Sequence, residues 1–213
     1  PNMLIFGIFI ILPAVVGLRL ALYEWSDLGG GEFVGLANFR RLFGDEMFWI
    51  TTRNTMIYVL SVVPLLLLTS LSLGVLTAKR LQAVAVFRSL YYLPAMLSFV
   101  IVAIVWRWIL GDELGIVNYI LRQVGLQPVS WLTAPGMARG SVIFATVWMR
   151  TGFFMVMFVA GLQAIPDEFY DAAAIDGATP RQTFFRVTLP LLKPTVLVVT
   201  VLSTIEAFKA FEI

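Results

Sequence analysis

The 213-residue sequence contains no cysteine and no histidine. Without cysteine it can form no disulfide, thiolate nucleophile or zinc–thiolate site. Without histidine it lacks the commonest general base and metal ligand. We therefore predict neither a catalytic site nor a metal site in this chain. A P-loop is missing as well, because none of the three lysines follows a glycine; they are Lys79, Lys193 and Lys209.

Charged residues are also scarce. They make up 13% of the chain, whereas 60% of the residues are hydrophobic. A soluble domain carries roughly 25% charged residues, so this composition predicts a protein that lies in a lipid bilayer. The formal net charge is only +2. No basic run is present, and we therefore expect no nucleic-acid partner.

The sequence does contain long apolar stretches. Five of them approach or exceed the roughly 20 residues that a helix needs to cross a bilayer. The predicted fold class is therefore all-α, a polytopic membrane protein with one transmembrane domain over residues 1–213. Proline inside such a span either kinks the helix at a gating hinge or is simply tolerated; this applies to Pro13, Pro64 and Pro94. The predicted spans are residues 3–23, 54–78, 87–110, 141–162 and 191–213.

The distribution of basic residues predicts the orientation of these spans. The short link after the second span carries a dense cluster of Lys79, Arg80 and Arg88. The link between the third and fourth spans has only Arg122 and Arg139 over a longer stretch. Basic residues favour the cytoplasmic side, so we expect the first link to be cytoplasmic. The alternation of spans then places residues 163–190 in the cytoplasm too.

Residues 163–190 form a polar segment between two spans, and their pattern predicts two short helices. Pro166 can open the first helix, whose first turn is acidic, and Gly177 can end it in a left-handed conformation. Thr179 is a candidate N-cap for the second helix, with Pro180 at its first position and Gln182 completing a capping box. Pro190 is expected to end the second helix.

The same segment carries a recognisable motif. It contains Asp-Ala-Ala at 171–173 and Asp-Gly-Ala at 176–178, followed by Phe184, Val187, Leu189 and Pro190. This pattern resembles the "EAA" cytoplasmic loop of permease subunits in binding-protein-dependent ABC importers. Asp171 replaces the usual glutamate and Val187 the usual isoleucine. Segments 53–55, 87–94, 160–166 and 207–211 extend the resemblance over nearly the whole chain, which is similar to carbohydrate permeases of the maltose and glycerol-phosphate type.

The resemblance implies a role for the 163–190 loop. In this family such a loop couples the permease to a separate nucleotide-binding ATPase subunit, which would hold ATP and Mg; this chain itself needs no cofactor. The alternative, an interfacial helix on lipid headgroups, is disfavoured by the four acidic residues of the segment. The expected coupling residues are Asp171, Ala172, Ala173, Asp176, Gly177, Ala178, Phe184, Val187, Leu189 and Pro190.

The resemblance also implies further partners. A second homologous permease would form the other half of the pathway, and an extracytoplasmic solute-binding protein would deliver the solute. The location would be the plasma membrane of a bacterium or archaeon, and the full protein would have about six or more spans. In the extracytoplasmic loops, Trp25, Trp49 and Trp131 either sit at the headgroup level or contact the binding protein.

Charged residues inside the spans are costly if they face lipid. Arg150 lies mid-span with no acid three or four residues away, so it should face the bundle interior and reach Glu206 on the next span. Alternatively, Glu206, Lys209 and Glu212 neutralise one another along their own helix. Nearby Trp148 and Phe153 either line a substrate pathway or belong to ordinary core packing.

These patterns lead to one predicted function and one alternative. The chain is expected to be half of an ATP-driven pathway for a sugar, a polyol phosphate or a related polar solute. The alternative is a non-transporting membrane scaffold or assembly protein. Co-purification with an ATPase distinguishes the two.

Overall fold

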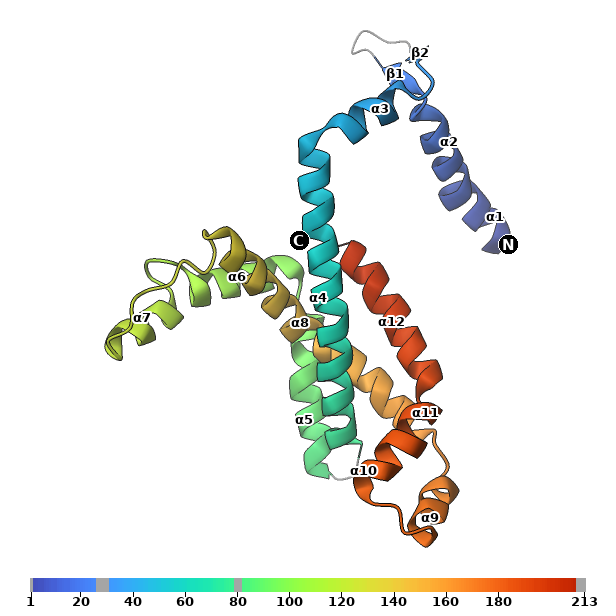
Figure 1. The fold of residues 1–213 in the computed structure, drawn as a ribbon, viewed down its shortest axis with the longest axis vertical. Helices are drawn as coiled ribbons and strands as arrows, with labels where there is room; N and C mark the ends of the chain where they lie inside the picture. Colours follow the sequence, from blue (N-terminus) through green and yellow to red (C-terminus); the bar gives the residue numbers. More distant parts are fainter. Residues whose placement is uncertain (1, 26–30, 79–81, 210–213) are drawn as a thin grey trace. The chain divides into compact units, whose positions relative to one another are not determined.

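The computed structural model describes residues 2–25, 31–78 and 82–209, without the side chains of 82–84. The chain divides into two compact units, Pro1–Met56 and Ile57–Ile213 (Figure 1). Among these described residues, three helices are long and apolar enough to cross a membrane, and two bent helix pairs bring the number to five if each pair is one span. The predicted all-α polytopic fold class is confirmed. The assignment of residues 1–213 to one transmembrane domain stays a prediction.

The first unit begins with an apolar helix that corresponds to the first predicted span. It runs over Asn2–Leu20 and contains a π-helical turn just before Pro13. Proline has no N–H and clashes with the carbonyl four residues earlier, and the wider π turn accommodates both effects. Pro13 therefore modifies the helix without ending it. The parts are α1 Asn2–Phe6, η1 Gly7–Ile11 and α2 Leu12–Leu20.

A short hairpin follows, which the sequence analysis did not anticipate. β1 Tyr23–Trp25 pairs antiparallel with β2 Gly31–Phe33, so that Glu24 stands opposite Glu32. Arg41 of α3 (Ala37–Gly44) donates to Glu24 Oε1 at 2.6 Å. This hydrogen bond, with the attraction between the charges, lowers the pKa of Glu24 and raises that of Arg41.

The second span begins earlier than hydropathy indicates. α4 covers Glu46–Thr77, so the predicted start at residue 54 is wrong. Asp45 Oδ1 accepts a hydrogen bond from the Met47 amide at 2.9 Å, as an N-cap side chain does, and Glu46 complements the helix dipole in the first turn. The helix therefore starts at its cap, ahead of the polar residues 51–54 and the long apolar run. Pro64 lies inside α4 without interrupting it.

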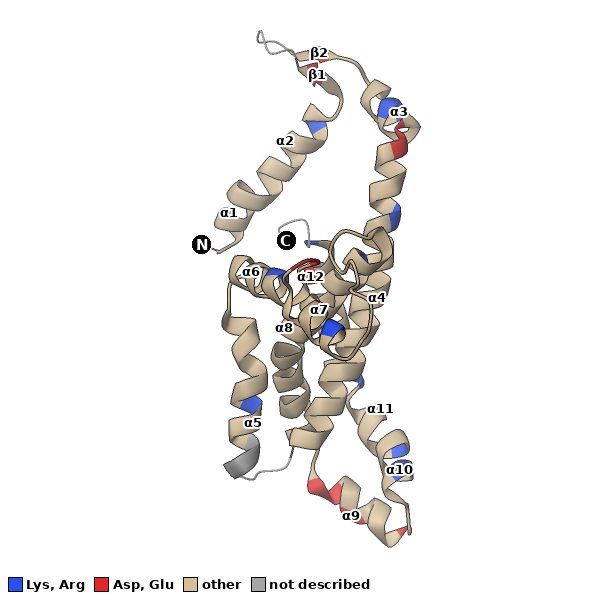
Figure 2. Ribbon diagram, turned by 90° about the vertical axis from the view of Figure 1, so that its left-hand side faces the viewer, with Lys and Arg blue, Asp and Glu red and all other residues tan. Residues whose placement is uncertain are grey.

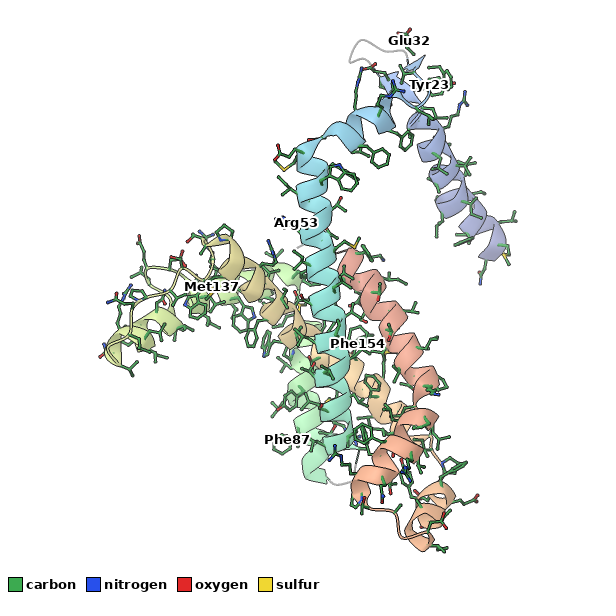
Figure 3. The ribbon with its side chains drawn as sticks, viewed as in Figure 1. Tyr23, Glu32, Arg53, Phe87, Met137 and Phe154 are labelled. Atoms are coloured by element: carbon green, nitrogen blue, oxygen red, sulfur yellow. The ribbon has the colours of Figure 1, made fainter. Side chains whose placement is uncertain are left out.

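The core of the second unit lies where α8 (Pro135–Gln163) packs against α4 and α12 (Lys193–Phe208). Phe154 of α8 is fully buried there, and Figure 3 shows it beside α4. Hydroxyl groups also link α8 to α4: Tyr58 donates to Thr146 Oγ1 at 3.0 Å, and the Thr69 and Thr151 hydroxyls lie 3.0 Å apart. Such small polar contacts hold helices together where water is absent.

The third predicted span, residues 87–110, is not one straight helix. Two helices are separated by a 3-10 turn and bent by 100° relative to each other. Pro94 lies in that turn, and Ser98 then caps the next helix by accepting from the Ile101 amide at 3.3 Å. Within one continuous apolar run, therefore, one helix ends and another begins. The parts are α5 Gln82–Tyr92, η2 Leu93–Met96 and α6 Phe99–Leu110.

The segment after Gly177 also differs from the prediction. The chain stays helical through Pro190, because a π turn over Phe184–Thr188 precedes this proline and absorbs the lost hydrogen bond. It bends by 65° only at Leu192, so the predicted stop at Pro190 is wrong. The predicted end of the last span at Ile213 lies outside the described residues. The parts are α10 Pro180–Thr183, η3 Phe184–Thr188 and α11 Leu189–Leu191, before α12.

The contact of α8 with α5 and η2 leaves no room for a side chain at Gly152. A Cβ there would overlap the Tyr91 carbonyl group. We expect Gly152→Ala to destabilise the second unit by about 1–3 kcal/mol or more, as overpacking does. Thermal unfolding of the purified protein measures this loss. The matched control is Gly140→Ala on the same helix, where nothing lies within 4 Å; equal stability of the two variants would contradict the prediction.

Candidate functional site: the 163–190 loop and the Arg150–Glu206 ion pair

The 163–190 loop begins with the helix that the sequence predicts. α9 covers Asp167–Ile175, with Pro166 at its N-cap and acidic residues in its first turn. Gly177 has φ = +69°, and the Ala178 amide donates back to the Ala173 carbonyl at 2.9 Å while that of Gly177 donates to Ala174 at 3.1 Å. This is a Schellman motif, which requires the left-handed residue. The predicted helix end at Gly177 is confirmed.

The second half of the loop is held by side-chain hydrogen bonds. The capping box between Thr179 and Gln182 is present in both directions, as predicted. The Thr188 hydroxyl donates to the Tyr170 hydroxyl at 3.4 Å, which joins η3 to α9. Between the loop and the ends of α4 and α8 lies a groove of about 530 Å³, bordered by Val75, Leu162, Tyr170, Ala174 and Phe184 among others.

The predicted coupling residues differ in accessibility. Ala173 is only 8% exposed, so it packs within the loop and supports its shape. Ile175 was not singled out by the sequence analysis, yet it is 86% exposed. An aliphatic side chain presented in this way, beside charged groups, suits a protein contact. Asp171, Ala172, Asp176, Gly177 and Pro190 are exposed, whereas Ala178, Phe184, Val187 and Leu189 are half-buried.

The loop shares one end of the second unit with the link after α4. Gln163 Nε2 at the end of α8 donates to the Ala78 carbonyl at 3.3 Å. Arg88 of α5 donates through Nε to the Thr77 carbonyl at 2.8 Å. Both links therefore lie at the same end of the second unit in the described part of the chain. Their location in the cytoplasm stays a prediction, and Lys79 and Arg80 lie outside the described residues. Figure 2 shows acidic residues gathered on α9 and basic ones on the segment that follows.

The two charged residues predicted to meet inside the helical bundle do so. Arg150 Nε of α8 lies 3.3 Å from Glu206 Oε2 of α12. Glu206 therefore pairs with Arg150 and not with Lys209 of its own helix. Glu212, the third member of that alternative, lies outside the described residues. The two side chains are 22% and 35% exposed. Within the described chain, Glu206 Oε2 is buried and accepts no hydrogen bond, so the contact is an ion pair without hydrogen-bond geometry.

Phe99 at the start of α6 completes this cluster, and the sequence analysis missed it. The Arg150 guanidinium carbon lies 4.8 Å from the centre of the Phe99 ring, which is a cation–π distance. The bend at Ser98 brings Phe99 there, so no linear pattern indicates the contact. Arg150 is thereby held by groups from α6 and α12.

The two aromatic residues proposed for a substrate pathway have other neighbours. Trp148 stacks edge-on against Trp106 of α6, with ring centres 5.5 Å apart. Phe153 packs edge-on against Phe154 at 5.2 Å and borders the core. A mostly apolar cavity of about 250 Å³ lies between α6 and α8, lined by Phe99, Trp106, Thr146 and Met149 among others. Trp106 was also missed, because it carries no charge or motif.

Helices of spanning length, a polar helical loop at one end of the second unit and an ion pair inside the bundle define a polytopic membrane protein. The family described as "Binding-protein-dependent transport system inner membrane component" matches residues 53–212. The chain belongs to this family. It is a transmembrane permease subunit of an ABC importer.

Relatives match along the whole chain. The trehalose/maltose transport system permease protein MalF of Thermococcus litoralis is 35% identical over 214 residues, covering 100% of this chain and 72% of that protein. The lactose transport system permease protein LacF of Rhizobium radiobacter is 33% identical over 215 residues, covering 100% and 72%.

Solved structures share the fold. A bacterial ABC transporter involved in the import of the acidic polysaccharide alginate matches with a TM-score of 0.84 and 29% identity, covering 100% of this chain and 72% of that one. A bacterial alginate ABC transporter in complex with alginate pentasaccharide-bound periplasmic protein matches with a TM-score of 0.80 and 30% identity, covering 95% and 68%.

Proposed function

We propose that this permease subunit imports a carbohydrate and forms half of its translocation pathway. The observation that carries the proposal is the similarity, over the full length of the chain, to permeases named for trehalose/maltose and lactose. The bundle interior supports it. Sugars present apolar ring faces and polar edges, which suit aromatic rings beside hydrogen-bonding groups. Trp148, Phe153 and the Arg150–Glu206 pair offer these two kinds of group.

ATP hydrolysis in this proposal takes place on a separate nucleotide-binding subunit that holds ATP and Mg. This chain contributes the surface onto which that subunit docks. Asp171 and Asp176 offer exposed carboxylates there, and Ile175 offers an exposed apolar side chain. The Schellman motif and the capping box fix the angle between the two loop helices, so movement of the docked subunit would be transmitted to α8 and α12.

The remaining partners follow from the same assignment. A second homologous permease supplies the other half of the pathway, and an extracytoplasmic solute-binding protein delivers the sugar. A related transporter has been seen with its periplasmic protein bound. The complex belongs in the plasma membrane of a bacterium or archaeon. The family membership favours this role over the alternative of a non-transporting scaffold.

The test is ATP hydrolysis by the whole importer in proteoliposomes, with its binding protein and a panel of solutes. Disaccharides, pentoses, acidic oligosaccharides, polyol phosphates and amino acids are supplied one at a time. We expect a sugar to stimulate hydrolysis and to accumulate inside the vesicles, and an amino acid to do neither. Stimulation by non-carbohydrate solutes alone would overturn the substrate assignment. Failure of an ATPase to co-purify would overturn the role of the loop.

A further inference from the structure

The loop between α6 and α8 contains a helix that buries an asparagine and exposes an apolar side. α7 covers Ile116–Gln123, and its Asn118 is completely buried. On the opposite side of the helix, Ile116, Tyr119 and Ile120 are exposed. A helix on a water-soluble surface turns its apolar face inward. α7 does bury the apolar side chains of Val117 and Leu121 in part, but it also exposes a second apolar side where a water-soluble helix would be polar.

The buried side chain of Asn118 holds the loop together through hydrogen bonds. Its Nδ2 donates to the carbonyls of Asp112 at 2.9 Å and Val129 at 2.8 Å. Its Oδ1 accepts from the Val129 amide and from the Trp131 indole, both at 3.0 Å. The Trp131 N–H is therefore engaged inside the protein, and the location of its ring at the headgroups or on a binding protein stays a prediction. These bonds fix α7 in place before any partner arrives.

The exposed face of α7 continues onto α6. Ile116, Tyr119, Ile120 and Val124 recur at helical spacing, and Leu114 before them is 94% exposed. On α6 the exposed large apolar side chains include Val100, Ile101, Ile104 and Trp108, and Ala103 and Arg107 are exposed as well. Among the described residues, α6 and α7 lie at the end of the second unit opposite α9 and α10 (Figures 1 and 2).

We propose that this α6–α7 face, defined by the large apolar residues above, lies in the headgroup–acyl boundary of the extracytoplasmic leaflet, so that α7 is an interfacial anchor and not a water-exposed loop. The chain is a membrane component by family, and the face continues the apolar surface that such a protein presents to lipid. Trp108 and Tyr119 are the residue types that settle at this depth. The choice of leaflet rests on the orientation in the proposed function.

The composition of the face distinguishes lipid from a second permease. Helix–helix interfaces in membranes are enriched in glycine, alanine, serine and threonine, which allow close approach. The residues that define the α6–α7 face are large aliphatic and aromatic side chains, although the small residue Ala103 is exposed beside them on α6. Lipid chains adapt to bulky side chains, whereas a partner helix would need matching holes.

The chain has no native cysteine, which permits a direct test in the assembled importer. Single cysteines replace Ile120 on the face and, as the control, Gln127 in the exposed loop that follows. Each is spin-labelled in proteoliposomes, and collisions with oxygen and with a water-soluble nickel complex are measured, calibrated by spin-labelled lipids. We expect the label of Ile120→Cys to meet oxygen but to lose contact with nickel, at a depth of about 5–10 Å.

The label of Gln127→Cys should meet nickel. If the Ile120→Cys label meets nickel equally, the face is in water and the proposal is wrong. If it meets neither reagent, protein covers the face, and the proposal is also wrong. ATP hydrolysis by both variants, measured in the same vesicles, shows that the labels leave the complex assembled. A failure of sugar transport would leave these accessibilities unchanged, so the two proposals fail separately.

Discussion

Gly177→Val is expected to release the ATPase subunit from the permease, so that uptake and substrate-stimulated ATP hydrolysis fall together while the permease stays in the membrane. Gly177 has φ = +69°, a conformation that costs other residues about 1–2 kcal/mol, and more for a β-branched side chain. In the described part of the chain, and apart from the two adjacent residues, no atom lies within 4 Å of a Cβ placed there. The expected loss of coupling therefore arises from strain in the backbone at residue 177 and from a clash of the valine side chain with the docked ATPase subunit.

Asp171→Ala should act on the same contact by a different route. Asp171 is exposed, so its loss leaves the loop folded. Removing a charge-assisted hydrogen bond to the ATPase subunit would cost about 1–3 kcal/mol, or roughly 5- to 150-fold in affinity. Co-purification of the ATPase subunit in detergent, with membrane abundance of the permease measured alongside, gives the result for both variants.

Conservative variants serve as controls for the two changes. Asn tolerates the left-handed conformation, so Gly177→Asn should retain more coupling than Gly177→Val. Asp171→Glu keeps the charge, and restores the residue usual in the family, so it should couple normally. Normal association and uptake in Gly177→Val and Asp171→Ala would show that the loop is not the coupling element. Loss of the permease itself from the membrane would instead indicate misfolding.

The second large effect is expected at the Arg150–Glu206 pair. Arg150→Leu or Glu206→Leu alone leaves one charge without its partner inside the bundle. Breaking a fully buried pair costs about 3–5 kcal/mol, and partial exposure reduces the cost here. We expect each single variant to lower both the amount of folded permease and its uptake activity, with uptake reduced further than the amount explains.

The double variant Arg150→Leu/Glu206→Leu separates stability from transport. Replacing both charges with apolar groups often restores stability, so the amount of folded permease should recover. Uptake per folded complex should remain low if the pair lines the sugar pathway. Full uptake in the double variant would remove Arg150 and Glu206 from the pathway. Abundance by immunoblotting and uptake of labelled sugar in the same vesicles provide the two measurements.

Local patterns predicted the 163–190 loop in detail. The positive φ of Gly177 and the Thr179–Gln182 capping box are both present, because each depends on residues within one helical turn. The Asp45 cap is equally local and marks the start of α4. The hydropathy criterion missed this start, because it detects only the apolar part of the helix. The stop predicted at Pro190 failed for a related reason, since a π turn allows a proline to remain in a helix.

The sequence by itself determined the apolar lengths, the charge that must be neutralised inside the bundle and the short-range helix ends, since each depends on composition or on neighbours within a few residues. Only the tertiary structure decided the 100° bend before Phe99, the cation–π contact of that ring with Arg150 and the inward position of Asn118. Hydropathy records how apolar a segment is but not its direction. The direction is set by which helix packs against which, and α8 leaves no room for a side chain at Gly152 where α5 meets it.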